Sequence, residues 1–452
     1  MLNYLSLLSE VKAKIIAYNQ FLKSETGTTD LPEKFESLPL LTKQSYLMKY
    51  KMEELCRAED LQNFHLIGAS SGFSKTGAIY WPKRPCDEAG YMNALETMFV
   101  TNYHIDTRRT LVIECLAFGM WIGGMQIAAA MRYIALSGKY HFTLATPGLD
   151  LKAAASVIDT YHQYFDQILI ITNPSNISLI QAILKDKGTA LPDGFIYFPV
   201  VGEYYTESFR EHVCCAFGHP VDSPYVVWTG YGSADTGDIS AETESTIRLR
   251  KFFFHHPELS EQWFGTHSTP MILAISSNVY LELIDGKIVV TKDQFIPLVR
   301  YNTGDAGALL PKKSLQGIVP DELYSSLPEE MMYVFGRADN AVIFYGTNLM
   351  INDIIEYLLS LPAEKCYGGL FTVHERMNEG INCFDFTIYV TDTKKADAED
   401  YYNLLIDYLC KSSAEFNIKY QNLSKSVDTP LITVRLSDIL KLDNKIKHRY
   451  II

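Results

Sequence analysis

The chain has 452 residues, of which 47% are hydrophobic and 21% charged, and its formal net charge is −13. This length predicts two or three domains, and the composition is typical of a globular protein. The acidic balance argues against a nucleic-acid partner, because phosphate neutralisation requires a basic surface, whereas ATP needs only a few local donors and a metal.

The N-terminal segment, residues 1–22, lacks the basic start and the cleavage site of a signal peptide, and its spacing predicts one amphipathic helix. The apolar stretch 115–131 is shorter than the roughly 20 residues of a membrane span, so we predict a buried strand–loop–helix there. The eight cysteines include no Cys-x-x-Cys pair, which favours free thiols in a reducing compartment. We therefore expect a cytoplasmic protein without a membrane partner.

From about residue 60 to residue 240, short apolar runs alternate with longer segments of helical periodicity. The apolar runs lie at 111–113, 168–172, 196–200 and 225–228. Fully apolar strands that alternate with helices indicate a sheet covered on both faces. The predicted fold class is therefore α/β, with a large N-terminal domain of parallel-type sheets flanked by helices.

The pattern changes near residue 270, where apolar and polar residues begin to alternate. Residues 278–291 predict a hairpin, because Asp285-Gly286 supplies the positive φ of a tight turn. This predicts a small β-rich subdomain at about 270–335, which completes an N-terminal core over residues 1–335.

A third pattern begins at residue 336 with a strand, a turn and a helix. Asp353 and Glu356 form a predicted capping box for that helix. Further strands are expected at 384–390 and 431–436, around a helix at 398–410. We predict that residues 336–452 form a mobile C-terminal α+β lid domain.

The first motif with chemical meaning is Ala69-Ser-Ser-Gly72-Phe-Ser-Lys-Thr-Gly77. Hydroxyls, a lysine and two glycines in one turn can cradle a phosphate, since glycine lets backbone N–H groups approach closely. The spacing is not that of a Walker-type loop, and a plain Ser/Gly-rich loop is the alternative interpretation.

The second motif, Thr229-Gly-Tyr231-Gly232-Ser233-Ala234-Asp235-Thr-Gly237, follows the apolar strand at 225–228. A strand that opens into a glycine-rich turn is where α/β sheets bind nucleotides. Tyr231 is a candidate to stack on adenine and Asp235 to reach a magnesium ion. The alternative is a tight connection with a surface aspartate.

Three further features point to nucleotide chemistry. Asp305 in Thr303-Gly304-Asp305 can hold a ribose diol, and Arg337 in Gly336-Arg337 can hold nucleotide oxygens. Near the end of the chain, Lys445 can meet the charge that develops at the α-phosphate if it lies on a mobile lid, and a solvated basic tail is the alternative.

Taken in order from about residue 35 to residue 450, these motifs resemble the adenylate-forming superfamily, and its phenylacetate–CoA ligase-like branch in particular. Phe35-Glu-Ser-Leu-Pro-Leu-Leu-Thr-Lys43 is similar to the entry segment of those ligases. Gly202-Glu203 with Thr206-Glu207-Ser-Phe-Arg210 is similar to their Gly-x-Glu-Pro-x-[Thr/Ser]-Glu-x-x-Arg element. Thr172-Asn-Pro174-Ser175 resembles a Thr-Pro-Ser-like turn.

The resemblance implies a role for each matching position. The nucleotide would be bound by Ser70, Ser71, Gly72, Thr76, Gly202, Glu203, Tyr231, Gly232, Ser233, Asp305 and Arg337. The catalytic residues would be Lys445 and Asp235, with Asp235 beside Mg²⁺ and Asp339 as the hinge. The acyl pocket would be lined by Phe118, Trp121, Gly123 and Gly124.

The implied function is an ATP-dependent, AMP-forming ligase that activates a carboxylic acid as an acyl-adenylate and transfers it to a thiol, coenzyme A. ATP, Mg²⁺ and coenzyme A are the implied cofactors and co-substrates, and relatives suggest a homodimer. One alternative transfers the acyl group to a carrier protein, a protein cysteine or an amine. Another is a non-catalytic nucleotide-binding relative, because the phosphate loop and Asp235 depart from the family pattern.

Overall fold

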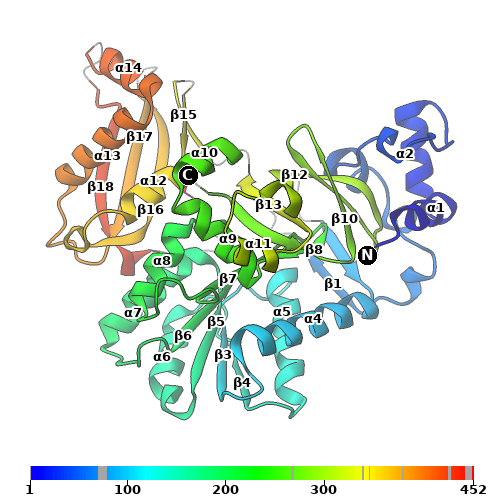
Figure 1. Ribbon diagram of the computed structural model, residues 1–452, viewed down its shortest axis with the longest axis horizontal. Helices are drawn as coiled ribbons and strands as arrows, with labels where there is room; N and C mark the ends of the chain where they lie inside the picture. The colour runs from blue at the N-terminus through cyan, green and yellow to red at the C-terminus, as the bar shows by residue number, and fades with distance from the viewer. Residues whose placement is uncertain are drawn as a thin grey trace. The chain divides into compact units, whose positions relative to one another are not determined.

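The computed structural model describes residues 2–69, 79–265, 269–337, 341–345, 347–378, 381–425, 429–442, 450 and 451. The chain forms two compact units, and each is described by itself (Figure 1). Unit 1 comprises Met1–Thr146, Trp228–Leu249 and Met271–Arg337. Unit 2 comprises Pro147–Val227, Arg250–Pro270 and Ala338–Ile452. None of the described helices is long and apolar enough to cross a membrane.

Unit 1 combines helices with mostly antiparallel strands. Its helices are α1 (Tyr4–Lys14), α2 (Ile16–Thr26), α3 (Met52–Leu55), α4 (Pro85–Tyr103), α5 (Ile122–Leu136), α11 (Asp321–Ser326) and the start of α9 (Glu244–Phe254). Its strands are β1 (Leu66–Ala69), β2 (Tyr80–Lys83), β3 (Thr110–Glu114), β4 (Phe142–Ala145), β7 (Val227–Ser233), β8 (Gly237–Ala241), β9 (Met271–Ile275), β10 (Val279–Ile284), β11 (Lys287–Lys292), β12 (Leu298–Pro311) and β13 (Glu330–Arg337).

Seven of these strands lie side by side in the order β10-β11-β12-β13-β9-β8-β7, and neighbouring strands run antiparallel. The predicted hairpin is confirmed, since β10 pairs with β11 and Asp285 and Gly286 both have positive φ at its turn. Strands β3 and β4 are parallel and are joined through α5. The apolar stretch 115–131 is therefore part of a strand–loop–helix, as predicted.

The N-terminal segment differs from the single predicted helix. Ile15 adopts an extended conformation (φ −98°, ψ 110°) and separates α1 from α2. Buried apolar residues of both helices pack against the segment around Phe35 and Leu41 and against the start of β12. Tertiary packing of two short helices on this core outweighs the continuous helical periodicity.

Unit 2 contains parallel strands, the helices next to them and a C-terminal α+β part. Its helices are α6 (Leu151–Tyr161), α7 (Pro174–Lys187), α8 (Glu207–Ala216), the end of α9, α10 (Pro257–Phe264), α12 (Ile351–Leu359), α13 (Ala398–Ser412) and α14 (Ala414–Leu423). Its strands are β5 (Gln167–Ile171), β6 (Ile196–Val200), β14 (Ala341–Phe344), β15 (Thr347–Met350), β16 (Tyr367–Asn378), β17 (Ile381–Val390) and β18 (Ile432–Asp438).

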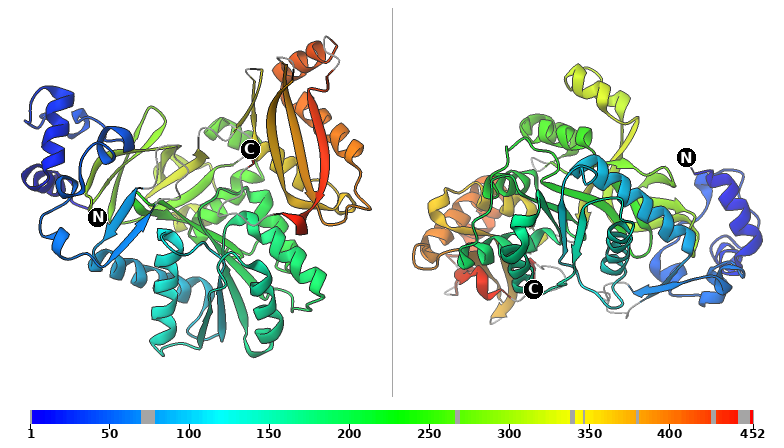
Figure 2. Two further views of the ribbon diagram at one scale, coloured as in Figure 1. Left: turned by 180° about the vertical axis from the view of Figure 1, so that it is seen from behind. Right: turned by 90° about the horizontal axis from the view of Figure 1, so that it is seen from below.

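Two sheets organise unit 2. Strand β5, which is buried along its whole length, pairs in parallel with β6 through the crossover helix α7. In the C-terminal part, β16-β17-β18 form a second sheet, and α12, α13 and α14 share one apolar core with it. Figure 2 shows the orange helices alongside the orange and red strands. The α/β fold class is therefore confirmed, and the strands and helix expected near 384, 398 and 431 are present.

One local prediction for the C-terminal part is wrong. Helix α12 begins at Ile351 after the N-cap residue Met350, so Asp353 lies inside the first turn and not at the cap. The turn from β15 leads directly into the helix, and the buried Ile351 anchors its first position. The division into a core over 1–335 and a mobile lid over 336–452 stays a prediction.

Candidate functional site

The structure describes part of the predicted site. Six candidate residues lie outside the described residues: Ser70, Ser71, Gly72, Thr76, Asp339 and Lys445. For Arg337 only the backbone is described.

Two predicted nucleotide residues contact each other in unit 1. The hydroxyl of Tyr231 in β7 donates a hydrogen bond to Oδ2 of Asp305 in β12, at 2.6 Å. Burial, followed by the neighbouring Asp305 charge, raises the pKa of Tyr231 well above its ordinary value. No further partner of the Asp305 carboxylate occurs among the described side chains.

Asp305 lies in a strand and not in the tight turn that the sequence predicted. The Thr303-Gly304-Asp305 motif interrupts the pairing of β12 with β11 as a bulge, and Gly304 has a φ of +82°. The Asn302 side chain accepts from the Gly304 N–H at 2.9 Å, and the Thr303 hydroxyl accepts from the Asp305 N–H at 3.2 Å. Across β12 and β13, Asp305 is paired in register with Arg337, as their predicted common role requires.

The Gly-rich motif that contains Tyr231 is also more ordered than predicted. Tyr231, Gly232 and Ser233 form the end of β7 instead of a turn. A Cβ atom at Gly232 would lie 2.2 Å from the carbonyl oxygen of Gly237 in the facing strand, so only glycine fits there. The close approach of β7 and β8 therefore holds Tyr231 and Asp235 at opposite ends of a short, rigid hairpin.

Asp235 is held by two side chains. Its Oδ2 accepts a hydrogen bond from the Tyr301 hydroxyl at 2.7 Å, and its Oδ1 lies 3.8 Å from Nζ of Lys43. The Asp235 carbonyl oxygen also accepts from the Gln294 side chain at 2.7 Å. No local sequence signal points to Lys43 or Tyr301, because both contact Asp235 across more than 60 positions of the chain.

The entry segment reaches Asp235 because it runs beside β12. The Leu41 N–H donates to the Arg300 carbonyl at 3.0 Å, and the Asn302 N–H donates to the Leu41 carbonyl at 2.9 Å. The Arg300 guanidinium, which is 3% exposed, binds Glu282 and the carbonyl oxygens of Glu36 and Leu38. The two motifs at 35–43 and 299–305 thus fold together and place Lys43.

Two buried lysines lie close to the same hairpin. Lys292 Nζ contacts the Asp238 carboxylate at 3.1 Å and would lie 3.4 Å from a Cβ atom at Gly237. Burial, followed by the nearby Lys292 charge, lowers the pKa of Lys83 in β2. Lys292 is therefore paired with Asp238, and the sequence pattern indicated neither lysine.

The predicted acyl segment packs against the start of the predicted phosphate loop. The Ala69 N–H donates to the Met120 carbonyl at 2.6 Å, and a Cβ atom at Gly68 would lie 2.6 Å from the Ile122 side chain. Trp121 is half-buried at the N-cap of α5, and Gly124 is buried. Phe118 is half-buried and Gly123 is exposed, and the acyl pocket stays a prediction.

The predicted adenine residue Glu203 has a structural partner in unit 2. Its carboxylate accepts from the Ser175 N–H at 3.0 Å and from the Ser175 hydroxyl at 3.1 Å, which satisfies donors in the first turn of α7. The preceding Gly202 has a φ of +85°. Burial and the Glu203 charge raise the pKa of Tyr450, so the described C-terminal end lies near this helix start.

The Thr-Glu-x-x-Arg element forms a buried charge cluster in unit 2. Oε1 of Glu207 lies 3.3 Å from Nε of Arg210, and its Oε2 lies 3.6 Å from Nε of Arg250. Lys251 lies 4.0 Å from the same carboxylate, and Thr206 caps α8. Glu207 is 1% exposed and Arg210 and Arg250 are 0% exposed, so the cluster is part of the protein core.

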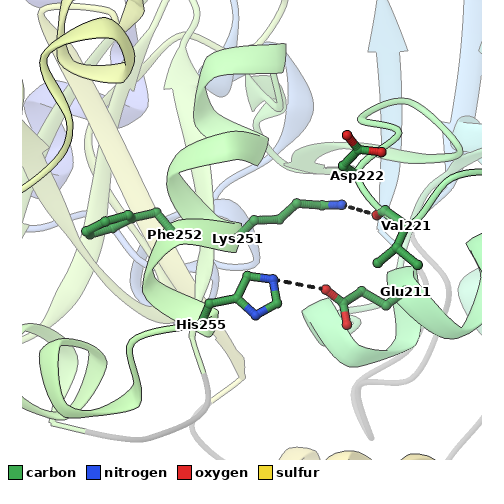
Figure 3. A pocket seen from close by; sticks show the side chains of 6 residues that line it. All are labelled: Glu211, Val221, Asp222, Lys251, Phe252 and His255. Carbon is green, nitrogen blue, oxygen red and sulfur yellow. Dashed lines mark hydrogen bonds and ion pairs between the residues drawn. The ribbon is translucent and has the colours of Figure 1, made fainter.

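A pocket of about 390 Å³ lies next to this cluster (Figure 3). His255 points to Glu211 at 3.3 Å, and Lys251 donates to the Val221 carbonyl. Asp222 and Phe252 complete the lining, and none of the predicted site residues belongs to it. His255, Glu211 and Lys251 already have partners inside the protein, so we assign no ligand to this pocket.

The described residues contain no group of three or more His, Cys, Asp or Glu side chains that could hold a metal ion. Both carboxylate oxygens of Asp235 are engaged, and the Lys43 ammonium opposes a second cation. This donor set does not fit a magnesium site built by the protein. Mg²⁺ commonly takes most of its ligands from phosphates and water, so we assign it no contact here.

No protein-family model matches this sequence, and no curated protein sequence is similar enough to match. Solved structures do match. A 2-hydroxyisobutyryl-CoA ligase in the postadenylation state, in complex with 2-HIB-AMP, has a TM-score of 0.64 at 14% identity, over 99% of this chain and 88% of that chain. The acyl acid amido synthetase AtGH3.15, in complex with 2,4-DB, has a TM-score of 0.50 at 10% identity, over 89% of this chain and 83% of that chain.

Sequence identities this low establish the fold alone. The chain has the fold of adenylate-forming enzymes, and the resemblance inferred from the ordered motifs is confirmed at that level. The assignment to the phenylacetate–CoA ligase-like branch stays a prediction.

Proposed function

We propose that this protein is an ATP-dependent, AMP-forming ligase that activates a carboxylic acid as an acyl-adenylate and transfers it to coenzyme A. The observation that supports this most directly is the contact between Tyr231 and Asp305, with Arg337 facing Asp305 in register. An aspartate carboxylate that one hydroxyl holds in place is suited to a ribose diol.

In this proposal the residues of unit 1 bind and orient the nucleotide. Asp305 accepts from the ribose hydroxyls, Tyr231 lies against the adenine, and Arg337 binds ribose or phosphate oxygens. The Gly-rich loop with Ser70, Ser71, Gly72 and Thr76 holds the phosphates, and Gly232 and Ser233 border the nucleotide. The charged pair of Lys43 and Asp235 flanks the phosphates. Asp235 therefore acts on Mg²⁺·ATP only through the electrostatic field of this pair and not as a metal ligand.

The chemical step follows from these roles. The substrate carboxylate attacks the α-phosphate, pyrophosphate leaves, and the acyl-adenylate remains bound. Lys445 stabilises the developing charge and orients the carboxylate, which is an electrostatic and positioning role. Rotation of the lid at Asp339 then removes Lys445, and the thiol of coenzyme A attacks the mixed anhydride and releases AMP.

The test is pyrophosphate release from Mg·ATP over a panel of aryl, short-chain and long-chain acids, with hydroxylamine as a trap for the adenylate. We expect acid-dependent release in the wild type. Lys445→Ala should abolish release and leave ATP binding near normal. The matched variant Lys441→Ala removes an exposed lysine four positions earlier and should behave as the wild type.

Product analysis with coenzyme A, a carrier protein and amines then identifies the acceptor. Formation of an acyl-CoA supports the proposal. An acyl-protein or an amide product would mean that the acyl group is transferred to a protein or to an amine instead of coenzyme A. Tight ATP binding without pyrophosphate release from any acid would contradict the ligase function and favour a non-catalytic nucleotide binder.

A further inference from the structure

Glu114, the last residue of β3, is a buried carboxyl group that receives no hydrogen bond from the described part of the chain. It is 0% exposed, and neither carboxylate oxygen accepts a hydrogen bond from any described residue. Burial raises the pKa of Glu114 to about 8, and no neighbouring charge contributes to that shift. A polar group in this position costs free energy unless it is bonded, so a purely structural role does not explain it.

The position of Glu114 in the fold points to a ligand. Strand β3 is parallel to β4, and ligands of α/β sheets bind outside the carboxyl ends of parallel strands. The chain continues from Glu114 directly into the connection that ends at Trp121 and α5. Because the Ala69 N–H bonds to Met120 in this connection, it also lies against the start of the predicted phosphate loop.

The same connection carries a second polar group that lacks a partner. The indole N–H of Trp121 is buried and has no acceptor among the described residues. An indole N–H can only donate, whereas a carboxyl group keeps at least one accepting oxygen in either protonation state. The Trp121 indole therefore needs a hydrogen-bond acceptor, and Glu114 needs a hydrogen-bond donor.

The groups around Glu114 do not supply what it needs. Burial and then the Glu114 charge raise the pKa of Cys115. The pKa of Tyr91 in α4 is raised by burial, then by Asp238 and then by Glu114, so both side chains lie near Glu114. Neither donates a hydrogen bond to Glu114 in the described residues, and no lysine, arginine or histidine pairs with it there. Glu207 of unit 2, by comparison, is surrounded by three cations.

We propose that Glu114 determines substrate specificity by accepting a hydrogen bond from a hydroxyl group on the acyl part of the acid. A hydroxyl both donates and accepts, so hydroxy acids satisfy Glu114 and leave an acceptor for an indole N–H. An ammonium group can donate to Glu114 but cannot accept a hydrogen bond from an indole N–H. This inference rests on the proposed ligase function and specifies its substrate class.

The experiment compares acids that share one carbon skeleton and differ by a hydroxyl or an amino group. The readout is kcat/KM for pyrophosphate release by the wild type, Glu114→Gln and Glu114→Leu. We expect the wild type to prefer a hydroxy acid over its deoxy analogue by about 10-fold to 100-fold, because the analogue leaves Glu114 unbonded. Glu114→Leu should lose this preference, chiefly because its kcat/KM for the hydroxy acid falls. Glu114→Gln should retain part of the preference.

The matched control is Glu242→Gln. Glu242 is equally buried, at 2% exposed, but its carboxylate accepts from the Thr229 N–H at 3.1 Å. The hydroxy/deoxy ratio should not change in this variant. Equal losses with both acids in Glu114→Leu, or a preference for the amino acid over the hydroxy acid in the wild type, would overturn the proposal.

Failure of the proposed function is distinguishable from failure of this inference. If no acid supports pyrophosphate release, calorimetric titration of the wild type and Glu114→Leu with the same acids measures binding directly. Tighter binding of hydroxy acids that depends on Glu114 supports the specificity role without catalysis. Absence of that dependence overturns it.

Discussion

Four carboxylates, two in each unit, differ in the partners that the described residues give them. In unit 2, Glu203 accepts two hydrogen bonds from the first turn of α7, and Glu207 faces three cations. In unit 1, Asp305 is bonded by one tyrosine hydroxyl and Glu114 by no described residue. Glu203 and Glu207 contribute to the fold through these partners, although the two Glu207 oxygens are paired by charge alone, and we propose that Asp305 and Glu114 bind a ligand. Substitutions should therefore divide into losses of stability and losses of binding.

The largest expected effect is on stability and comes from Glu207→Ala. The change leaves Arg210 and Arg250 buried without their shared counter-charge, which costs roughly 3–5 kcal/mol of unfolding free energy. Denaturant unfolding measures this loss. Glu244→Ala, which breaks an exposed ion pair with Arg248, is the control and should cost about 0–1 kcal/mol. Similar losses in both variants would show that the buried cluster contributes no more to stability than an exposed ion pair.

Glu114→Gln should have the opposite sign, with an effect on stability that grows from pH 5 to pH 8. The folded-state pKa of Glu114 is about 8 and its ordinary value is 4.5, so between these values the unfolded chain binds fewer protons than the folded chain. Glu114 therefore lowers the unfolding free energy by about 1.4 kcal/mol for each pH unit of rise in this window. Relative to the wild type, the variant should become more stable from pH 5 to pH 8. Denaturant unfolding at several pH values measures this difference. If the difference in unfolding midpoint between the wild type and the variant does not change with pH, Glu114 has a partner in the folded protein.

Asp305→Ala should separate binding from stability. Loss of the carboxylate leaves ribose hydroxyls and Tyr231 without their partner, and we expect ATP affinity to fall by about 1–3 kcal/mol. Calorimetric titration measures the affinity, and thermal unfolding without ATP should change little because Asp305 is only half-buried. Unaltered ATP affinity would remove Asp305 from the nucleotide site.

The smallest expected effect is from Ser175→Ala. This change removes the hydroxyl that donates to Glu203, while the Ser175 N–H still donates to the Glu203 carboxylate, which caps α7. We expect a loss of about 0.5–1.5 kcal/mol in stability. Ser156→Ala removes an exposed helix hydroxyl that bonds to the Lys152 carbonyl and serves as the reference. A large loss of ATP affinity in Ser175→Ala would instead place Glu203 in the binding site.

The ordered motifs predicted the adenylate-forming fold, and local patterns predicted much of the secondary structure. The Asp285-Gly286 hairpin and the apolar strand β5 could be predicted because their signals lie within a few residues. The bulge at Gly304 and the break at Ile15 were missed, because a bulge depends on the facing strand and the break depends on packing.

The sequence by itself determined which residue types are present for nucleotide chemistry and in what order. Only the tertiary structure decided their partners: Tyr231 bonds to Asp305, Lys43 and Tyr301 hold Asp235, and Glu203 caps a helix. The physical reason is distance along the chain. Hydrogen bonds and desolvation act over a few ångströms in space, and these partners are separated by 28 to more than 190 positions in sequence.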